Sequence, residues 1–208
     1  MESKEYGNMK SEQLYKLLAK YYDDIYAEKD YKGEAEALIK LISDAGIKER
    51  SKLLDLACGT GNHLKYLKEK YICNGLDKNI EMLKIAEKKL PGIGLMHQDM
   101  LKRIEGRYDI IISMFSSIAY VQSYSAFRTV ACNISDALKP GGMLIIQPWF
   151  ESGAFEPGVY QRNIEIRSDL SILRLMKSSI EGICSILEYH YLINESGKIH
   201  YIKDEHSM

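Results

Sequence analysis

The sequence lacks the charge excess and the long apolar runs that mark several large classes of protein. Its 208 residues include 28 basic and 29 acidic side chains, which leave a formal net charge of -1. Such a balance provides no overall field to attract nucleic acid or an anionic membrane surface. No window approaches the roughly 20 apolar residues of a membrane helix. We therefore expect neither a nucleic-acid partner nor a membrane partner.

Cysteine is scarce, and histidine is not grouped as a metal site requires. No cysteine pair has the spacing of a zinc site or of a disulfide framework, since the four lie far apart at Cys58, Cys73, Cys132 and Cys184. The opening MESKEYGNMK has no apolar signal core. Near the C-terminus, His190, His200 and His206 are predicted to face solvent as partners of nearby tyrosines. These features predict a cytoplasmic protein without a metal.

Two helices are predicted at the start of the chain. From Ser11 to about Glu28, apolar and tyrosine residues recur at spacings of three and four, which is typical of one helix face. A second pattern runs from Lys32 to Ala45, and Gly46 is placed to end it in a left-handed conformation. Tyr22 and Tyr26 belong to this apolar stripe. A place in the core therefore explains these two tyrosines as well as a role in a site does.

Between residues 52 and 146, short apolar runs alternate with helical patterns. The predicted strands are LLDLA, ICNGLD, GIGLMHQ, YDIIISMF and MLIIQPW, with helices near residues 62–70, 79–89 and 123–138. This alternation is typical of a parallel sheet with helical crossovers on both faces. It predicts an α/β, Rossmann-like doubly wound fold. The run Glu87-Lys88-Lys89 is predicted to be a solvated helix face.

After Phe150 the pattern changes to that of an antiparallel β appendage. Strand-like runs occur near residues 161–169, 171–180, 183–193 and 198–203, and residues 194–197 read as a hairpin loop. We therefore expect a Rossmann-like domain with N-terminal lid helices over residues 1–150. Residues 151–208 are expected to form an antiparallel β extension. We expect this extension to lie on the substrate side of a site or in a dimer interface.

A glycine-containing break, LLDLACGTG, interrupts the first strand pattern. Gly59 and Gly61 fall where the strand leads into a helix, and the absence of a Cβ lets a ligand approach the backbone closely. A dinucleotide fingerprint would require glycine where Leu64 stands, and no phosphate-binding loop of the G-x-x-x-x-G-K type is present. The break predicts a seat for a ligand. A nicotinamide dinucleotide is disfavoured and stays a lesser alternative, whereas a nucleoside triphosphate has no cradle for its phosphates.

Acidic residues accompany three successive strands. Asp55 lies within the first strand, Asp77 ends the second, and Asp99 follows the third. Asp77 is placed to accept bonds from a ribose diol or to cap the next helix. Asp99 is placed to accept from an adenine amine with Met100 packing on the ring, although an ordinary loop acid has the same appearance. Together they favour a phosphate-free nucleoside with a positive charge, and S-adenosylmethionine is such a ligand.

The same motifs carry a resemblance to a known family. In this order and spacing, LLDLACGTG, GLD, HQDM, RYDIIISMFSSIAY and LKPGGMLIIQPW resemble a class I S-adenosylmethionine-dependent methyltransferase. With YYDDIY and KDY upstream, the chain resembles the branch of TDP-amino-sugar N,N-dimethyltransferases. The resemblance implies S-adenosyl-L-methionine as cofactor and in-line methyl transfer to a small-molecule acceptor, an amine such as an amino sugar.

The resemblance also implies roles for individual residues. Besides the glycines and acids, the cofactor side would include Tyr22, Tyr31, Ala57, Lys78, Met82 and Met114. Tyr26 and Tyr120 would act near the methyl acceptor as catalytic residues, and the acceptor cavity would be lined by Ser117, Trp149 and Phe150. For Met82, Met114 and the aromatic pair, core packing is the alternative. For Ser117, it is a hydroxyl bonded to backbone.

Two departures from the family pattern bear on function. Related enzymes usually have a glutamate where this chain has Gln147, which weakens the expectation of a cationic amino-sugar substrate. They also continue beyond DEHSM with a helix and an antiparallel hairpin, so either this chain is truncated or the strands of the appendage cover the exposed sheet edge. We expect a five-stranded core, and an edge left open would favour homodimers. A non-catalytic S-adenosylmethionine-binding protein or a truncated remnant is therefore the alternative function.

Overall fold

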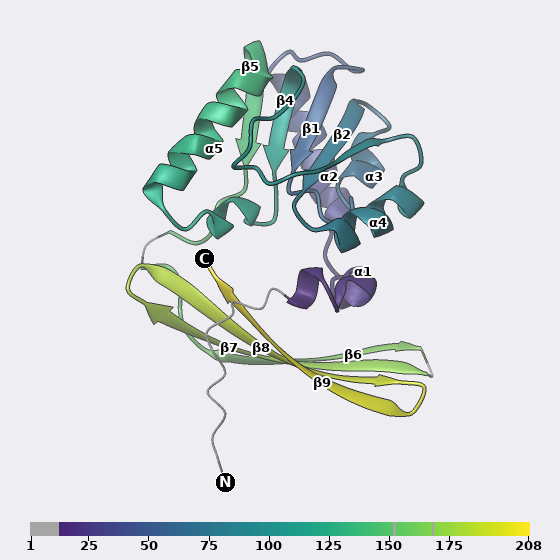
Figure 1. The fold of residues 1–208 in the computed structure, drawn as a ribbon. Coiled ribbons are helices and arrows are strands. Elements are labelled where there is room, and N and C mark those ends of the chain that lie inside the picture. The colour runs from purple at the N-terminus through teal and green to yellow at the C-terminus, as the bar shows by residue number, and fades with distance from the viewer. Residues whose placement is uncertain (1–12, 152, 168) are drawn as a thin grey trace. The chain divides into compact units, whose positions relative to one another are not determined.

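Five parallel strands form the sheet that carries the site. The computed structural model describes residues 13–151, 153–167 and 169–208, and it orders these strands β3-β2-β1-β4-β5 (Figure 1). Their bounds are β1 (Lys52–Leu56), β2 (Ile72–Asp77), β3 (Gly94–His97), β4 (Tyr108–Ser113) and β5 (Leu138–Ile146). The strand order reverses between β1 and β4, where doubly wound sheets bind ligands. The predicted fold class is confirmed.

Helices cover both faces of this sheet. The bounds are α2 (Tyr31–Asp44), α3 (Leu64–Leu67), α4 (Ile80–Lys89) and α5 (Tyr124–Ala137), with a 3-10 turn η3 (Ser117–Tyr120) before α5. On one face, Leu53 packs in a core with α2, α3 and α4, and on the other Leu54 packs in a core with α5. Adjacent residues of β1 thus serve opposite cores, as successive strand side chains must. Among the described residues, no helix has the length and apolar character needed to cross a bilayer.

The second predicted helix is confirmed in the form of α2, and its ends follow from local chemistry. Asp30 caps its N-terminus by accepting a hydrogen bond from the backbone N–H of Gly33 at 2.8 Å. A Cβ at residue 33 would lie 2.3 Å from the Asp30 carboxylate, so glycine leaves room for the cap. Beyond the C-terminus, Gly46 adopts a φ of +79°.

The first predicted helix is wrong as a continuous element. The described part consists of short pieces, η1 (Gln13–Tyr15), η2 (Ala19–Tyr21) and α1 (Tyr22–Ile25), while Ser11 lies outside the described residues. The apolar positions Leu14, Leu18 and Ile25 are buried, so the spacing reported burial correctly. The short turns bury these apolar side chains without one continuous helix. Tertiary packing commonly overrides a local helical pattern in this way.

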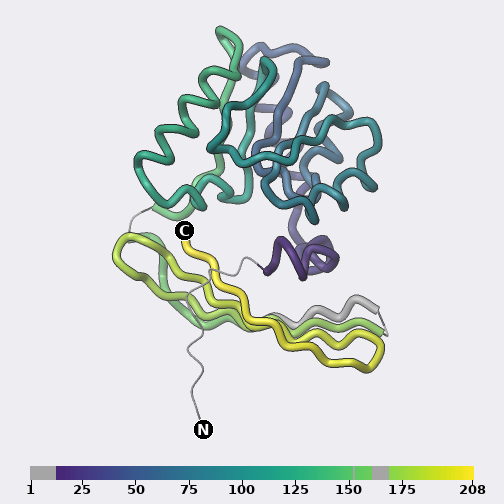
Figure 2. The backbone as a smooth tube through the Cα atoms, viewed as in Figure 1, coloured from purple at the N-terminus to yellow at the C-terminus, as the bar shows by residue number. Residues whose placement is uncertain are grey.

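The four C-terminal strands form a second, antiparallel sheet in the order β6-β7-β8-β9. Their bounds are β6 (Val159–Arg167), β7 (Leu170–Glu181), β8 (Cys184–Glu195) and β9 (Lys198–Ser207). Ser196 and Gly197, with φ of 52° and 79°, make the two-residue turn expected between β8 and β9. The backbone divides into two compact units, Tyr15–Glu151 and these strands with Gln13 and Leu14 (Figure 2).

A buried acid joins the start of the described chain to the second sheet. The Asp204 carboxylate accepts hydrogen bonds from the backbone N–H groups of Gln13 and Leu14, each at 2.7 Å. It also pairs with His206 at 2.9 Å, and both side chains are buried. The prediction that His206 faces solvent is therefore wrong, because it is the partner of a buried carboxylate. His190 does meet a tyrosine, the hydroxyl of Tyr201, at 2.6 Å.

Replacing Asp204→Ala should lower the free energy of unfolding by about 3 kcal/mol, because buried N–H donors and a buried histidine lose their acceptor. Urea denaturation followed by circular dichroism measures the change. Lys203→Met is the matched control, since it removes only an exposed partner of Glu188. Equal effects of the two substitutions would contradict this role for Asp204.

Candidate functional site

The loop after β1 is held in place by hydrogen bonds to the end of β2. Ala57 and Gly59 adopt left-handed φ angles of 65° and 56°. The N–H groups of Ala57 and Cys58 donate to the carbonyl oxygen of Leu76 at 2.7 and 3.0 Å, which holds the loop across the end of β2. The N–H of Gly59 then donates to the Asp77 carboxylate at 2.8 Å. The loop and the end of β2 therefore form one preorganised edge.

The two glycines of this loop serve different purposes. A Cβ on Gly59 would meet only the flexible end of Met82, at 3.3 Å, on the side where the loop lines a pocket. A Cβ on Gly61 would lie 2.5 Å from Leu90, and Gly61 lines neither of the pockets described below. Close packing against Leu90 thus explains Gly61, whereas Gly59 leaves space at the site.

Two adjoining pockets open at the carboxyl ends of the strands. The first is lined by the strand-end acids Asp77 and Asp99, and the second by Asp55 and His63. Five residues line both pockets and so mark their junction: Tyr22, Ala57, Gly59, Phe115 and Ser117. A ligand with two unlike halves would fill the pair, with its central atoms at the junction.

Asp55 provides the sharpest test of which ligand fits. Its side chain is 1% exposed, and its Oδ2 atom has no hydrogen-bond partner among the described residues. Burial, and then the nearby charge of Asp77, raise the pKa of Asp55 to about 7. An unpaired carboxyl oxygen in a pocket requires a donor, and a cationic amine supplies one. The second pocket therefore fits the amino-acid end of S-adenosylmethionine.

The acids of the first pocket are also held in place. Asp77 accepts from the backbone N–H groups of Gly59 and Asn79, both at 2.8 Å, and burial raises its pKa despite these bonds. Asp99 accepts from the N–H of Leu101 at 2.9 Å. Each carboxylate oxygen has capacity for a further hydrogen bond, so structural bonds and ligand binding coexist. This pocket fits an adenosine with its diol and amine.

A polar cluster ties α1 to the glycine loop. Asp23 accepts from the side chains of Thr60 at 2.6 Å and Asn62 at 2.9 Å. Lys89, at the end of α4, donates to Asp23 and to Asn62, each at 2.6 Å. The prediction that Lys89 is solvated is therefore wrong, because its side chain is 23% exposed and bound to this cluster. The cluster fixes the adjacent Tyr22, which lines both pockets.

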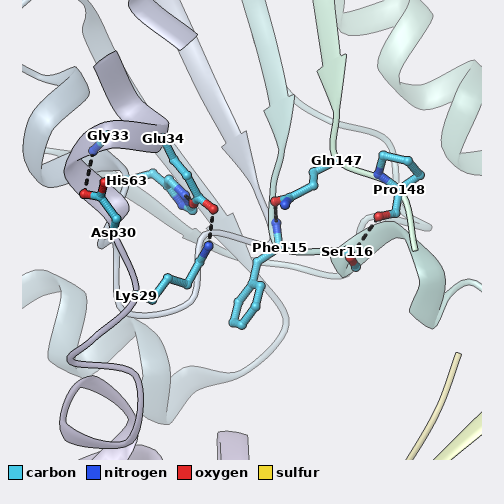
Figure 3. Close-up of polar contacts among 9 residues, drawn as sticks. All are labelled: Lys29, Asp30, Gly33, Glu34, His63, Phe115, Ser116, Gln147 and Pro148. Carbon is cyan, nitrogen blue, oxygen red and sulfur yellow. Dashed lines mark hydrogen bonds and ion pairs between the residues drawn. The ribbon is translucent and has the colours of Figure 1, made fainter. Parts of the chain in front are cut away.

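A second polar array supports the wall of the second pocket (Figure 3). Glu34 accepts from Lys29 through one carboxylate oxygen and meets the His63 ring at 2.7 Å through the other. Burial lowers the pKa of His63 even beside Glu34, so the imidazole is neutral at pH 7. The Lys29 ammonium lies 5.2 Å from the Tyr31 ring centroid and 4.7 Å from that of Phe115. The array thus positions three pocket-lining rings.

A strained bend follows β4. Phe115 and Ser116 have φ of 52° and 57°, a left-handed conformation that costs roughly 1 to 3 kcal/mol for each non-glycine residue. The bend donates two hydrogen bonds to the segment after β5 (Figure 3). Phe115 N–H donates to the Gln147 side-chain oxygen at 2.7 Å, and the Ser116 hydroxyl donates to the Pro148 carbonyl at 3.0 Å.

Aromatic side chains gather above the junction. The hydroxyl groups of Tyr15 and Tyr120 are hydrogen-bonded at 2.7 Å. The Tyr26 ring packs 4.9 Å from Tyr22 and 5.2 Å from Phe115, yet Tyr26 itself lines neither pocket. Burial raises the pKa of Tyr22 well above its usual range, so this phenol stays protonated. Members of this cluster therefore form an aromatic wall of the first pocket and offer phenol hydroxyls as hydrogen-bond donors.

The structure brings most of the predicted site residues together. Those that line a pocket are Tyr22, Tyr31, Asp55, Ala57, Gly59, Asp77, Lys78, Met82, Asp99, Met100, Met114, Ser117 and Tyr120. Those that line neither are Tyr26, Gly61, Trp149 and Phe150. Trp149 and Phe150 pack on each other with centroids 4.9 Å apart, and Phe150 is 58% exposed. Their roles toward the acceptor stay predictions.

Sequence reasoning missed several pocket residues. Phe115 lies two residues after the end of β4, and this position after a strand is a usable signal. His63 lies close behind the glycine pair in the same way. Tyr15 lies outside the apolar stripe of the first pattern, and nothing else in the sequence marks it as a pocket residue. Its place beside Tyr120 depends on tertiary structure.

Known proteins resemble this chain over most of its length. Residues 53–142 match the family described as a methyltransferase domain. A dTDP-3-amino-3,4,6-trideoxy-alpha-D-glucopyranose N,N-dimethyltransferase of Streptomyces venezuelae is 31% identical over 193 residues, covering 90% of this chain and 81% of that protein. A dTDP-3-amino-3,6-dideoxy-alpha-D-glucopyranose N,N-dimethyltransferase of Streptomyces fradiae is 32% identical, covering 85% and 70%. The crystal structure of Streptomyces venezuelae DesVI matches with a TM-score of 0.83 at 31% identity, covering 91% and 82%.

Binding of S-adenosylmethionine should strengthen about tenfold for each pH unit between pH 5 and 7, because only ionised Asp55 attracts its ammonium group. The raised pKa has the opposite effect on the free protein, whose fold loses stability as pH rises from about 4 through 7. Calorimetric titration at pH 5, 6 and 7 measures the affinity. Asp55→Asn should bind weakly with a flat pH profile, and an unchanged pH dependence in that variant would contradict the assignment.

Lys89→Met should release S-adenosylmethionine about tenfold faster, because the cluster around Asp23 loses its charged donor and α1 is held less firmly. Stopped-flow displacement of the bound cofactor measures the rate. The neighbouring Lys88→Met is the control, since Lys88 is exposed. Identical release rates for the two variants would show that the cluster does not retain the cofactor.

Proposed function

The chain belongs to the class I S-adenosylmethionine-dependent methyltransferases, in the branch of the TDP-amino-sugar N,N-dimethyltransferases, and from this premise we propose that it methylates the amine of a nucleotide-linked amino sugar. S-adenosylmethionine is the methyl donor of the class. The related proteins named above act on dTDP-linked 3-amino sugars by name. The acceptor proposed here is of the same chemical kind.

One observation carries the cofactor side of the proposal. Asp55 lines a pocket that adjoins the one lined by Asp77 and Asp99, and its buried Oδ2 atom has no hydrogen-bond partner within residues 13–151, 153–167 and 169–208. Carboxylates in both pockets suit an ammonium group, a ribose diol and an adenine amine. They would repel a pyrophosphate, which argues against dinucleotide chemistry.

The bound donor supplies an electrophilic methyl group on a positively charged sulfur. The residues of the chain have to hold donor and acceptor in line, and orientation of this kind contributes roughly 7 to 11 kcal/mol to lowering a barrier. Tyr22 and Phe115 line both pockets with aromatic surface, which excludes water and attracts positive charge. These rings therefore favour the charge distribution of methyl transfer.

The acceptor amine must arrive neutral, since nitrogen attacks through its lone pair. The hydrogen-bonded hydroxyls of Tyr120 and Tyr15 lie beside the first pocket and can align the nitrogen or pass its proton to water. Tyr26 acts in this proposal through the ring of Phe115, against which it packs edge-on at 5.2 Å. The β appendage is proposed to contribute to the acceptor side or to a homodimer interface.

Tyr120→Phe should lower kcat about tenfold to 100-fold, because the ring remains while the hydroxyl that aligns the amine is lost. Cofactor affinity should change little. Turnover on a panel of nucleotide-linked amino sugars, with product mass as readout, measures both the activity and the acceptor preference. Tyr124→Phe is the control, since Tyr124 is 82% exposed.

The same panel separates the proposal from its alternative. Tight binding of S-adenosylmethionine without turnover on any amine would favour a non-catalytic binding protein. Turnover only on acceptors without an amine would retain the methyltransferase and overturn the acceptor class. Absence of cofactor binding by the wild-type chain would overturn the site itself.

A further inference from the structure

The bend after β4 has a conformation that its own residues disfavour. Phe115 and Ser116 are consecutive left-handed residues, and a bulky side chain such as phenylalanine rarely adopts this conformation. The reversal brings Phe115 and Ser117 to the junction of the two pockets. Strain of this kind persists only where surrounding contacts over-determine it.

The contacts that hold the bend come from the segment that directly follows the neighbouring strand, β5. The Gln147 N–H donates to the Ser113 carbonyl at 2.9 Å, which continues the ladder between β4 and β5. Its side-chain oxygen then accepts from the Phe115 N–H at 2.7 Å (Figure 3). The Ser116 hydroxyl adds a bond to Pro148 at 3.0 Å. Gln147 lines neither pocket, so its side chain acts on the site through Phe115.

Phe115 lies at the junction of the two pockets. It is 37% exposed and lines both the acid-lined pocket for adenosine and the pocket of Asp55. Its ring is held edge-on by Tyr26, with centroids 5.2 Å apart, and by the Lys29 ammonium at 4.7 Å. The ring is therefore fixed on several sides, and its backbone is fixed by Gln147.

We infer that Gln147 is a positioning residue for methyl transfer. Its side-chain oxygen holds the left-handed bend and thereby sets the Phe115 ring as the wall that directs the donor toward the acceptor. The inference rests on the proposed function and extends it to a residue that touches neither substrate. It also gives the glutamine a task that depends on an acceptor oxygen and not on negative charge.

Two substitutions separate the acceptor oxygen from side-chain size. Gln147→Met keeps the length without an acceptor and should lower kcat about tenfold to 100-fold, with a smaller effect on the KM for S-adenosylmethionine, because misplacement by about 1 Å costs rate on this scale. Gln147→Glu keeps an acceptor oxygen and should retain most of the activity at pH 8. Equal losses in both variants would overturn the inference.

A double-mutant cycle tests whether Gln147 acts through Phe115. In a Phe115→Ala background, Gln147→Met should cause almost no further loss of kcat, whereas independent roles would give multiplied losses. Multiplied losses would overturn the inference. If Gln147→Met does not fold, as judged by circular dichroism, Gln147→Leu replaces it in the cycle, because leucine also lacks an acceptor oxygen.

The failure of this inference is distinct from failure of the proposed function. Wild-type protein that neither binds S-adenosylmethionine nor methylates an amine would remove the function on which the inference rests. An active wild type whose Gln147→Met variant has unchanged kcat would overturn the inference alone. Three results together support the inference. The kcat of Gln147→Met is reduced, Gln147→Glu retains most of the activity, and the losses of Gln147→Met and Phe115→Ala do not multiply in the double mutant.

Discussion

The hydrogen bond from Gly59 to the Asp77 carboxylate is the constraint on which the site depends. At 2.8 Å it joins the loop after β1 to the end of β2, and Asp77 also accepts from Asn79. With the loop fixed in this way, one oxygen of Asp55 is left without a hydrogen-bond partner in the part of the chain that the structure describes. These hydrogen bonds hold the loop and the strand end as one unit, and a ligand that binds to a rigid edge loses less affinity to ordering.

Residues that do not line the pockets hold their walls. Asp23 and Lys89 tie α1 to the glycine loop, and Gln147 holds the bend that carries Phe115. Tyr26 supports the same ring from behind. These contacts place aromatic surface on opposite elements around one junction, where a methyl group would have to be aimed. Substitutions at such positions change alignment first, because they leave the ligand contacts themselves in place.

The buried carboxylates of the site lower the stability of the free protein. Burial raises the pKa of Asp55 and of Asp77, so ionised carboxylates at these strand ends destabilise the fold until a cationic ligand binds. His63, whose pKa burial lowers, adds no positive charge to the pocket at pH 7. A cation in the second pocket would therefore meet the Asp55 carboxylate without repulsion from this neutral histidine. Active sites commonly trade stability for function in this way.

The sequence by itself determined the parallel sheet, the antiparallel appendage and the placing of Gly59, Asp77 and Asp99 at strand ends, because apolar periodicity and turn chemistry are local. Only the tertiary structure decided that Gly61 packs on Leu90 and that the first helix is broken. It also decided that Lys89 binds Asp23, 66 residues away. Such contacts depend on which distant segments meet, and a lysine on a polar helix face has the same local pattern whether it meets solvent or a carboxylate from another segment.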